Sequence, residues 1–225
     1  LLLSPARPIG VERLSRTAWD RTHMPRDPTH AIQTNVMRLR HHLGPGVIET
    51  DHHGYRVAVE KEAVDTHRFS DRAEHAEESL RAGRLRESEE QFTAALADAE
   101  GGDPWLDLAG RPRGEGERAR LHEVRLRAEE RRAALALRLG HPSAGEPERL
   151  CAEEPLREER WQLLMRSQVM AGRQADALRS YTRARKLLAT ELGLIPGRAL
   201  QTLERRILQQ DPTLLHPESV SDLLC

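Results

Sequence analysis

Apolar residues recur at every third or fourth position along most of the chain, which is the spacing of amphipathic α-helices. After residue 65 this pattern is nearly continuous and is broken only at turns that contain glycine or proline. The predicted helices are marked by the apolar positions within residues 69–80, 92–96, 121–135, 161–165, 177–188 and 200–207. Residues 101–116, which are rich in glycine, proline and charge, are predicted to form a flexible insertion.

The first 65 residues follow a different pattern. VIET (residues 47–50) and YRVAV (residues 55–59) are rich in β-branched or aromatic side chains and flank the turn sequence DHHG, which predicts a β-hairpin. Upstream, VERLSRTAW predicts a short helix through Val11, Leu14 and Trp19, and a longer helix follows at residues 29–43. Helix, turn, helix and hairpin in this order are typical of a winged helix-turn-helix.

The longer helix lies within HAIQTNVMRLRHHLGPG, a stretch without an acidic residue. Asp27 and Pro28 are typical of a helix start, and Gly44 is expected to end the helix. A helical wheel places four apolar side chains within a narrow arc that we expect to face a core: Ile32, Val36, Leu39 and Leu43. The opposite side carries His30, Gln33, Thr34, Met37, Arg38 and His41, with Arg40 at its edge. Composition alone favours a solvated surface helix, whereas the preceding helix and the following hairpin favour a helix that reads DNA.

An internal repeat links two parts of the helical region. AGRLRESEEQFTAA begins at Ala82 and AGRQADALRSYTRA begins at Ala171, and we compared both with the tetratricopeptide (TPR) pattern. The second copy matches at Trp161, Leu164, Gly172, Ala177, Tyr181 and Ala184, whereas the first matches only at Gly83, Phe92 and Ala95. This predicts a compact TPR-like bundle rather than a long regular array. The charged runs EERRAA and REER are expected to be solvated helix faces.

Composition narrows the function classes. The 225 residues are 38% hydrophobic and 32% charged with a formal net charge of −1, so a nucleic-acid contact has to rest on a local basic patch. Two cysteines provide neither a disulfide framework nor metal-ligand spacing, which favours the cytoplasm. No apolar run approaches the ~20 residues of a membrane span. No nucleotide-binding, G-x-S-x-G or H-E-x-x-H motif is present, so we expect neither an enzyme nor a cofactor. A metal site at His41–His42 and His52–His53 is disfavoured, because adjacent helical side chains diverge by ~100°.

Longer motifs carry a more specific resemblance. HAIQTNVMRLRHHLGPGVIETDHHGYRVAV resembles the OmpR-like winged-helix signature, and PLREERWQLLMRSQVMAGRQADALRSYTRARKLLATELGLIPGRALQTLERRIL resembles the bacterial transcriptional activator domain. Together they resemble the SARP family, pathway-specific activators of antibiotic biosynthesis in actinomycetes. The expected fold is mainly α. It comprises an N-terminally truncated winged helix-turn-helix with a hairpin wing (1–61), an all-α TPR-like helical bundle (65–212) and a C-terminal tail (213–225).

The SARP resemblance implies that the basic helix enters the major groove of double-stranded promoter DNA and that the wing touches the neighbouring backbone. The implied DNA-binding residues are Thr29, His30, Gln33, Thr34, Met37, Arg38, Arg40, His41, His53, Tyr55 and Arg56. Arg38 is expected to meet a guanine edge or a phosphate, and Arg40 and Tyr55 are expected to meet phosphates. The resemblance further implies a homodimer on DNA and contacts between the helical bundle and RNA polymerase.

Two departures from the family pattern lead to an alternative. Glu49 and Asp51 flank the wing where family members often carry a basic residue, so neutralisation of phosphates depends on protonation of His52 and His53. LLLSP at the start resembles the end of a helix whose beginning is missing. The alternative function is therefore a TPR-like protein–protein interaction module with a vestigial DNA-binding half.

Overall fold

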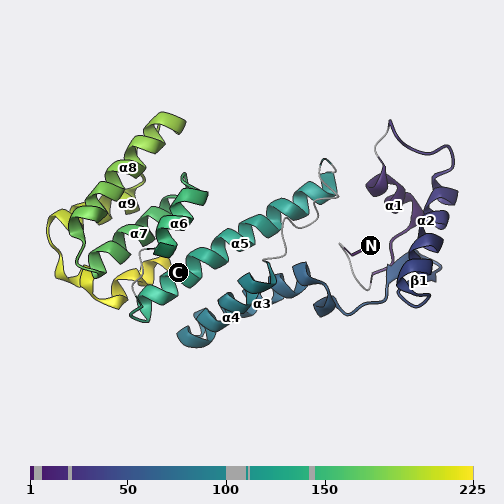
Figure 1. Cartoon of the computed structure of the whole chain (residues 1–225), viewed down its shortest axis with the longest axis horizontal. Coiled ribbons are helices and arrows are strands. Elements are labelled where there is room, and N and C mark those ends of the chain that lie inside the picture. The colour runs from purple at the N-terminus through teal and green to yellow at the C-terminus, as the bar shows by residue number, and fades with distance from the viewer. Residues whose placement is uncertain (3–6, 20–21, 100–109, 111, 142–144, 225) are drawn as a thin grey trace. The chain divides into compact units, whose positions relative to one another are not determined.

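The computed structural model describes residues 1–225 except 3–6, 20–21, 100–109, 111, 142–144 and 225 (Figure 1). The chain divides into two compact units. The first contains residues 1–71 and 98–123, and the second contains residues 72–97 and 124–225. Helices α3 (Asp65–Arg81), α4 (Leu85–Asp98) and α5 (Pro112–Arg138) therefore contribute residues to both units, α4 only through Asp98.

The two predicted helices of the first unit are confirmed as α1 (Val11–Ala18) and α2 (Pro28–Leu43). The Asp27 side chain accepts a hydrogen bond from the backbone N–H of His30 at 2.9 Å, and Pro28 occupies the first helical position. Gly44 ends α2 with a φ of 100°, a conformation that side chains with a Cβ rarely adopt. The local sequence therefore sets both ends of α2.

The core of the winged helix is smaller than the helical wheel predicts. Ile32 and Val36 are buried against the hairpin, and Val11, Leu14 and Trp19 pack around them. Leu39 and Leu43, expected to face the same core, are 44% and 56% exposed. They lie on the same side of α2, but α2 has 16 residues and α1 only 8, so α2 extends roughly 12 Å beyond the length of α1. Of the four apolar side chains predicted to face the core, only Ile32 and Val36 are confirmed there.

The predicted hairpin consists of β1 (Ile48–Asp51) and β2 (Gly54–Val57), paired antiparallel with Ile48 opposite Val57. Asp51 Oδ1 accepts backbone hydrogen bonds from His53 at 2.7 Å and Gly54 at 3.0 Å, which closes the turn. Val59 lies outside the strand that was predicted to contain it.

A segment ahead of α1 extends this sheet, which the sequence did not indicate. Ile9 and Tyr55 exchange two backbone hydrogen bonds, at 2.8 and 3.1 Å. Leu1 and Leu2, expected to end a helix, lie outside any helix, and residues 3–5 of the same motif are outside the described residues.

Gly54 is the residue that allows this close approach. Its φ is +135°, and a Cβ at this position would lie 2.2 Å from the carbonyl oxygen of Ile9. We predict that Gly54→Ala destabilises the winged helix by about 2 kcal/mol or more and accelerates amide hydrogen exchange at Ile9 and Tyr55. Gly46→Ala is the matched control, since a Cβ there meets nothing within 4 Å. Equal exchange rates in the two variants would contradict this account.

The 3₁₀ helix η1 (Lys61–Ala63) and seven further α-helices follow among the described residues. The α-helices are α3 (Asp65–Arg81), α4 (Leu85–Asp98), α5 (Pro112–Arg138), α6 (Gly145–Glu153), α7 (Glu158–Met170), α8 (Gln174–Leu192) and α9 (Arg198–Leu208). All but α6 are predicted by the apolar spacing. Pro112 starts α5, so the last part of the predicted flexible insertion is helical, while residues 101–109 and 111 are outside the described residues. Among the described residues no helix is long and apolar enough to cross a membrane.

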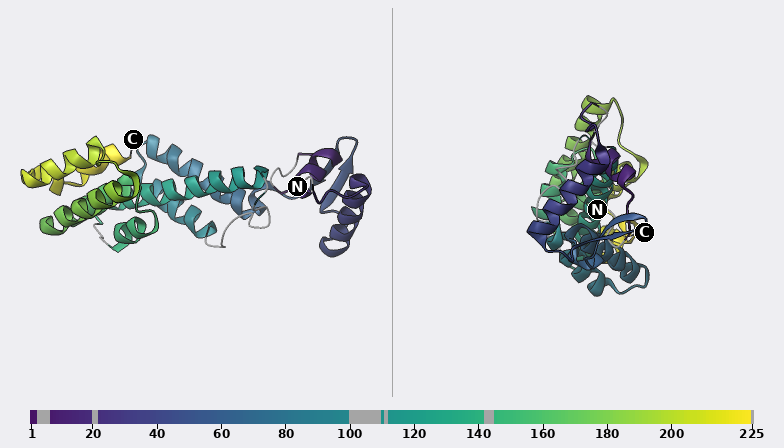
Figure 2. Two further views of the ribbon diagram at one scale, coloured as in Figure 1. Left: turned by 90° about the horizontal axis from the view of Figure 1, so that it is seen from above. Right: turned by 90° about the vertical axis from the view of Figure 1, so that its right-hand side faces the viewer.

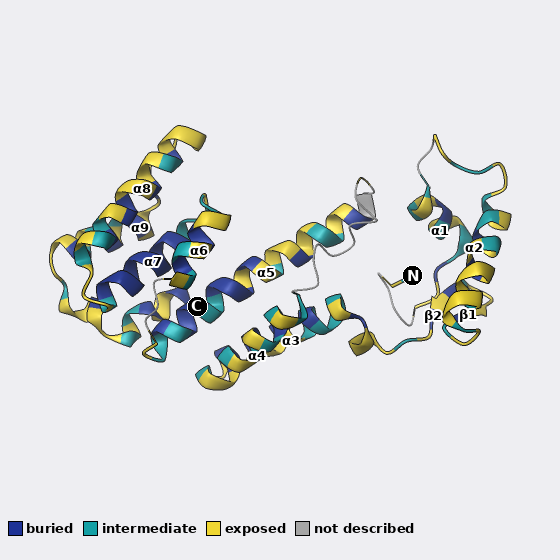
Figure 3. Ribbon diagram, in the orientation of Figure 1, coloured by how far each residue is buried: buried dark blue, intermediate teal, exposed yellow. Residues whose placement is uncertain are grey.

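The two repeats form matching helical hairpins, which confirms the TPR-like expectation. Gly83 between α3 and α4 and Gly172 between α7 and α8 both have a φ of 75°. In each turn the glycine N–H bonds to a carbonyl three residues earlier, and the next N–H bonds to one five residues earlier. Figure 3 shows α7 buried along almost its whole length, and Figure 2 shows α7, α8 and α9 side by side. Trp161 and Tyr181 belong to their shared core.

The charged runs EERRAA and REER were expected to be solvated helix faces, and this expectation is wrong. Arg160 of α7 is completely buried, and Glu129 and Glu130 of α5 are nearly so. Arg160 donates to Glu129 at 2.9 Å, to Glu130 at 3.0 Å and to the carbonyl of Leu150 in α6 at 2.8 Å. Arg157 donates to both oxygens of Glu130, at 2.6 and 2.8 Å. These groups avoid an uncompensated desolvation cost because each charge is paired in the interior.

Removing one member should therefore be costly. We predict that Arg160→Met lowers the free energy of unfolding by about 3–5 kcal/mol, because it leaves two buried carboxylates short of a partner. The control is Arg149→Met, since Arg149 forms an exposed pair with Glu153 and such pairs contribute less than about 1 kcal/mol. Urea unfolding measures the free energy of unfolding of both variants. Adding Glu129→Gln and Glu130→Gln to Arg160→Met should recover part of the lost stability. Equal losses of stability for Arg160→Met and Arg149→Met would show that the buried network does not stabilise the fold.

The predicted C-terminal tail is an integral part of the second unit. It contains the 3₁₀ helices η3 (Pro212–Leu215) and η4 (Pro217–Leu223). Leu214, Val220 and Leu223 are buried in the cores of the helical bundle. The sequence pattern did not reveal this, because the three residues belong to turns too short to show a helical period.

Candidate nucleic-acid interface

The outer face of α2 is exposed and carries no carboxylate between residues 28 and 43. Gln33, Met37, Arg38 and His41 are exposed on this face, and Thr34 is partly exposed. Met37 has 66% of its surface in solvent. These side chains are held outward because Ile32 and Val36, on the opposite side of the helix, are fixed in the core.

On this face of α2, Arg38 is the arginine whose guanidinium group is not paired with another group of the described chain. Its side chain is exposed and forms no hydrogen bond or ion pair with any described residue. A guanidinium in this state can bind a guanine edge bidentately or pair with a phosphate.

Arg40 is engaged by the hairpin. Its Nε donates to the Ile48 carbonyl at 2.8 Å and its Nη2 donates to the Thr50 hydroxyl at 2.7 Å. The guanidinium therefore fixes β1 relative to α2, and only its remaining donors are free for a phosphate. This positioning role was not apparent from the sequence, which placed Arg40 simply at the edge of the outer face.

The start of α2 is less receptive to anions than its sequence suggests. Thr29 and His30 are exposed there, as expected. The carboxylate of Asp27 already accepts the N–H of His30, so a phosphate at this helix terminus would meet a negative charge.

The wing offers little free positive charge. Arg56 pairs with its cross-strand neighbour Glu49, with Nε donating at 2.7 Å. Tyr55 is buried against Ile32 and Val36, so its expected phosphate contact is not supported by its position, and it serves as a core residue. His52 and His53 lie exposed at the tip of the hairpin.

Two further exposed arginines of the winged helix were missed from the sequence. Arg13 of α1 and Arg26, which immediately precedes the Asp27 cap, are exposed, and their side chains have no partner among the described residues. Arg26 lies in the connection between the two helices, outside every predicted element, which is why the helical wheel did not include it. Its position one residue before a helix cap was the available signal.

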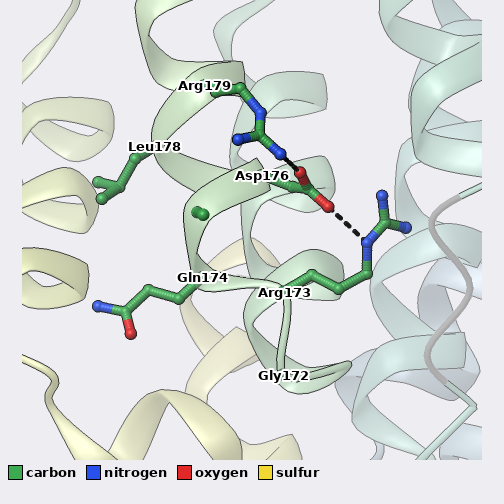
Figure 4. Close-up of a pocket in the computed structure, with 7 residues that line it drawn as sticks. Gly172, Arg173, Gln174, Asp176, Leu178 and Arg179 are labelled. Atoms are coloured by element: carbon green, nitrogen blue, oxygen red, sulfur yellow. Dashed lines mark hydrogen bonds and ion pairs between the residues drawn. The ribbon is translucent and has the colours of Figure 1, made fainter.

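Other candidate sites are weaker. The rings of His41 and His42 contact each other, as do those of His52 and His53, but among the described residues no three metal-binding side chains come together. A hollow at the start of α8 is flanked by Arg173 and Arg179. Figure 4 shows both guanidinium groups directed at Asp176, and the hydrogen bond from Arg173 is the main cause that lowers the pKa of this carboxyl. The arginines of the hollow are thus satisfied within the chain.

Comparison with known proteins identifies the chain's relatives. Residues 64–208 match the family described as the bacterial transcriptional activator domain. The chain is 38% identical over 217 residues to the regulatory protein AfsR of Streptomyces coelicolor, covering 95% of this chain and 22% of AfsR. It is 32% identical over 225 residues to the regulatory protein DnrI of Streptomyces peucetius, covering 94% of this chain and 82% of DnrI. The chain belongs to the SARP family.

A solved structure supports the fold of this SARP-family chain. Mycobacterium tuberculosis EmbR in complex with a low affinity phosphopeptide matches with a TM-score of 0.88 and 29% identity, over 100% of this chain and 60% of the EmbR chain. The match confirms the predicted combination of a winged helix and TPR-like helices. The chain spans less than two thirds of AfsR and of EmbR. AfsR and DnrI are named regulatory proteins, and EmbR is named a transcriptional regulatory protein.

Cys151 is the one described thiol, and its surroundings do not suit a nucleophile. It is buried on α6, and this burial raises its pKa to about 12. Because the thiolate is the reactive form, the folded protein keeps this group protonated and inert at neutral pH.

We therefore predict slow alkylation of Cys151. With Cys225 replaced by serine, iodoacetamide at pH 8 should modify Cys151 at least about a hundredfold more slowly in the folded chain than in urea, as followed by mass spectrometry. The raised pKa removes thiolate at every pH below about 12, so the difference should persist from pH 7 to pH 9. Native modification at the unfolded rate would show that the thiol is accessible.

Proposed function

We propose that this SARP-family chain binds double-stranded promoter DNA with α2 in the major groove, as part of a transcriptional activator. The observation that carries the proposal is the exposed, acid-free face of α2 with the unpaired guanidinium of Arg38, held on a winged helix. Arg38 reads a base edge, and Gln33 and Thr34 contact bases at the first half of the helix. Met37 packs against the groove wall, and His41 lies near the backbone.

Other side chains position the helix or contact phosphates. Arg40 holds the wing against α2 and offers its remaining donors to a phosphate. Thr29 and His30 mark the end of α2 that approaches the backbone, and Arg13 and Arg26 add phosphate contacts beside it. His53 carries the wing contact, because the charge of Arg56 is already neutralised by Glu49.

The second unit serves assembly in this proposal. The TPR-like bundle mediates a homodimer on DNA and contacts to RNA polymerase, and the regulated genes belong to secondary metabolism. Support comes from the SARP family membership and from the match of residues 64–208 to the bacterial transcriptional activator domain. The proposed site of action is the cytoplasm, and no cofactor or metal takes part.

Arg38→Ala tests the DNA interface. Full-length chain is first used to select bound sequences from a random duplex library, and a selected duplex then serves as the labelled probe. We predict that Arg38→Ala weakens binding about 5- to 150-fold, the equivalent of 1–3 kcal/mol for a lost base contact. If Arg38 meets a phosphate instead, the loss is uniform across sequences and the salt slope falls by about 0.9.

The control is Arg185→Ala, which removes an exposed arginine of α8 in the other unit. Arg38→Ala alone is a sharper test than a double variant with Arg40, because loss of Arg40 also releases the hairpin. Equal affinities and salt slopes for wild type, Arg38→Ala and Arg185→Ala would sink the proposal.

The second candidate is an interaction module whose winged helix no longer binds DNA. It is favoured by the Arg56–Glu49 pair and by the carboxylates of Asp27 and Asp51 at the helix start and the wing. Failure of the library selection to enrich any duplex, even at low salt, would favour this candidate.

A further inference from the structure

The chain ends in a short segment that folds back over the bundle. After α9 the segment of residues 212–224 runs through η3 and η4 and ends beside α5, where C marks the terminus in Figure 1. The match to the bacterial transcriptional activator domain stops at residue 208. The segment therefore lies beyond the part that defines the family domain.

Apolar anchors hold this segment in place. Leu214 joins the core formed by α7, α8 and α9. Val220 and Leu223, three residues apart on one side of a 3₁₀ helix, insert into a second core. That core consists of Ala133, Ala134 and Leu137 from α5, Leu150 from α6 and Leu163 from α7.

Three arginines surround the same anchors and bind the segment's acids and carbonyls. Arg166 of α7, which is buried, donates to Asp222 Oδ2 at 2.7 Å and to the carbonyl of Ser219. Arg131 of α5 donates to the carbonyl of Leu223. Arg138 pairs with Glu218 at 3.5 Å. We call this set of five apolar residues and three arginines the α5–α7 docking surface.

The docking surface has the composition of a recognition site. Arg138 and Arg166 face the acids Glu218 and Asp222, and the apolar floor takes two aliphatic side chains. Arg131 also pairs with Glu77 of α3. The segment contributes only 3₁₀ turns, which have little stability of their own, so the docking surface imposes its conformation. Burial lowers the pKa of Arg166, and its Nε has no hydrogen-bond partner, so the resident segment does not satisfy this arginine completely.

We propose that the α5–α7 docking surface is a binding site for an acidic segment of a partner protein, and that residues 217–223 occupy it when the partner is absent. The partner segment carries two aliphatic residues three positions apart with an aspartate directly before the second, as in Val220-Ser221-Asp222-Leu223. Tethering gives the resident segment a high effective concentration, so it keeps out weak or dilute competitors and is displaced by a segment with more contacts or by one in large excess. The bundle therefore has a partner-binding site that is closed until the resident segment is displaced and that is separate from the DNA interface.

The first test measures displacement in the wild-type full-length chain. The probe is a synthetic peptide with the sequence of residues 216–224, HPESVSDLL, added in large excess. We expect amides of residues 217–224 in the protein to exchange hydrogen faster when the peptide is present. The control peptide carries serine at the positions of Val220 and Leu223 and should have no effect. Unchanged exchange with HPESVSDLL would overturn the proposal.

The second test opens the docking surface. In the full-length variant Val220→Ser, Leu223→Ser, the fluorescein-labelled peptide HPESVSDLL should bind at least ten times more tightly than to wild type. Adding Arg138→Gln to this variant should weaken the binding, and Arg38→Ala should leave it unchanged, which separates this site from the DNA interface. Circular dichroism verifies that the helices of the variant persist. Equal peptide binding by wild type and by the folded variant Val220→Ser, Leu223→Ser would refute the proposal.

A second copy of the chain is the competing occupant. If segments exchange between copies, wild type should form a dimer that the variant Val220→Ser, Leu223→Ser loses in analytical ultracentrifugation. That outcome would replace the partner protein by the chain itself and would also overturn the proposal.

Discussion

The buried pairing of Arg160 with Glu129 and Glu130 is the constraint on which the helical bundle depends. It ties α7 to α5, and the bond from Arg160 to the Leu150 carbonyl adds α6. Apolar contacts tolerate small shifts between helices, whereas buried charges tolerate almost none, because any lost partner leaves a desolvated ion. The network thereby sets how α7 lies in the bundle, and α8, α9 and the C-terminal segment all pack on α7.

Arginine pairing also decides the character of the winged helix. Arg40 and Arg56 look like DNA contacts on a helical wheel or in a motif, but one holds the hairpin and the other is neutralised by Glu49. Arg38 differs only in having no partner within reach among the described residues. The number of arginines in such a face therefore overstates its available positive charge, and the pairing pattern shows which arginine side chain is left without a partner among the described residues.

Periodicity predicted most of the helices because a helical stripe is a local property. Apolar residues three and four apart lie on one face wherever the helix packs, so α3, α8 and α9 were correctly anticipated. The turn glycines Gly83 and Gly172 were found because both repeats need a left-handed residue at one place. Helix α6 was missed, since it is short and has a proline in its first turn.

The sequence by itself determined most of the α-helices, the hairpin turn, the outer face of α2 and the family. Only the tertiary structure decided that Leu39 and Leu43 are exposed to solvent, whereas Tyr55 and Glu129 are buried. It also decided that the last residues form part of the core. A local pattern states which side chains share a face, whereas burial and ion pairing depend on residues tens of positions away, and only the folded chain brings those residues together.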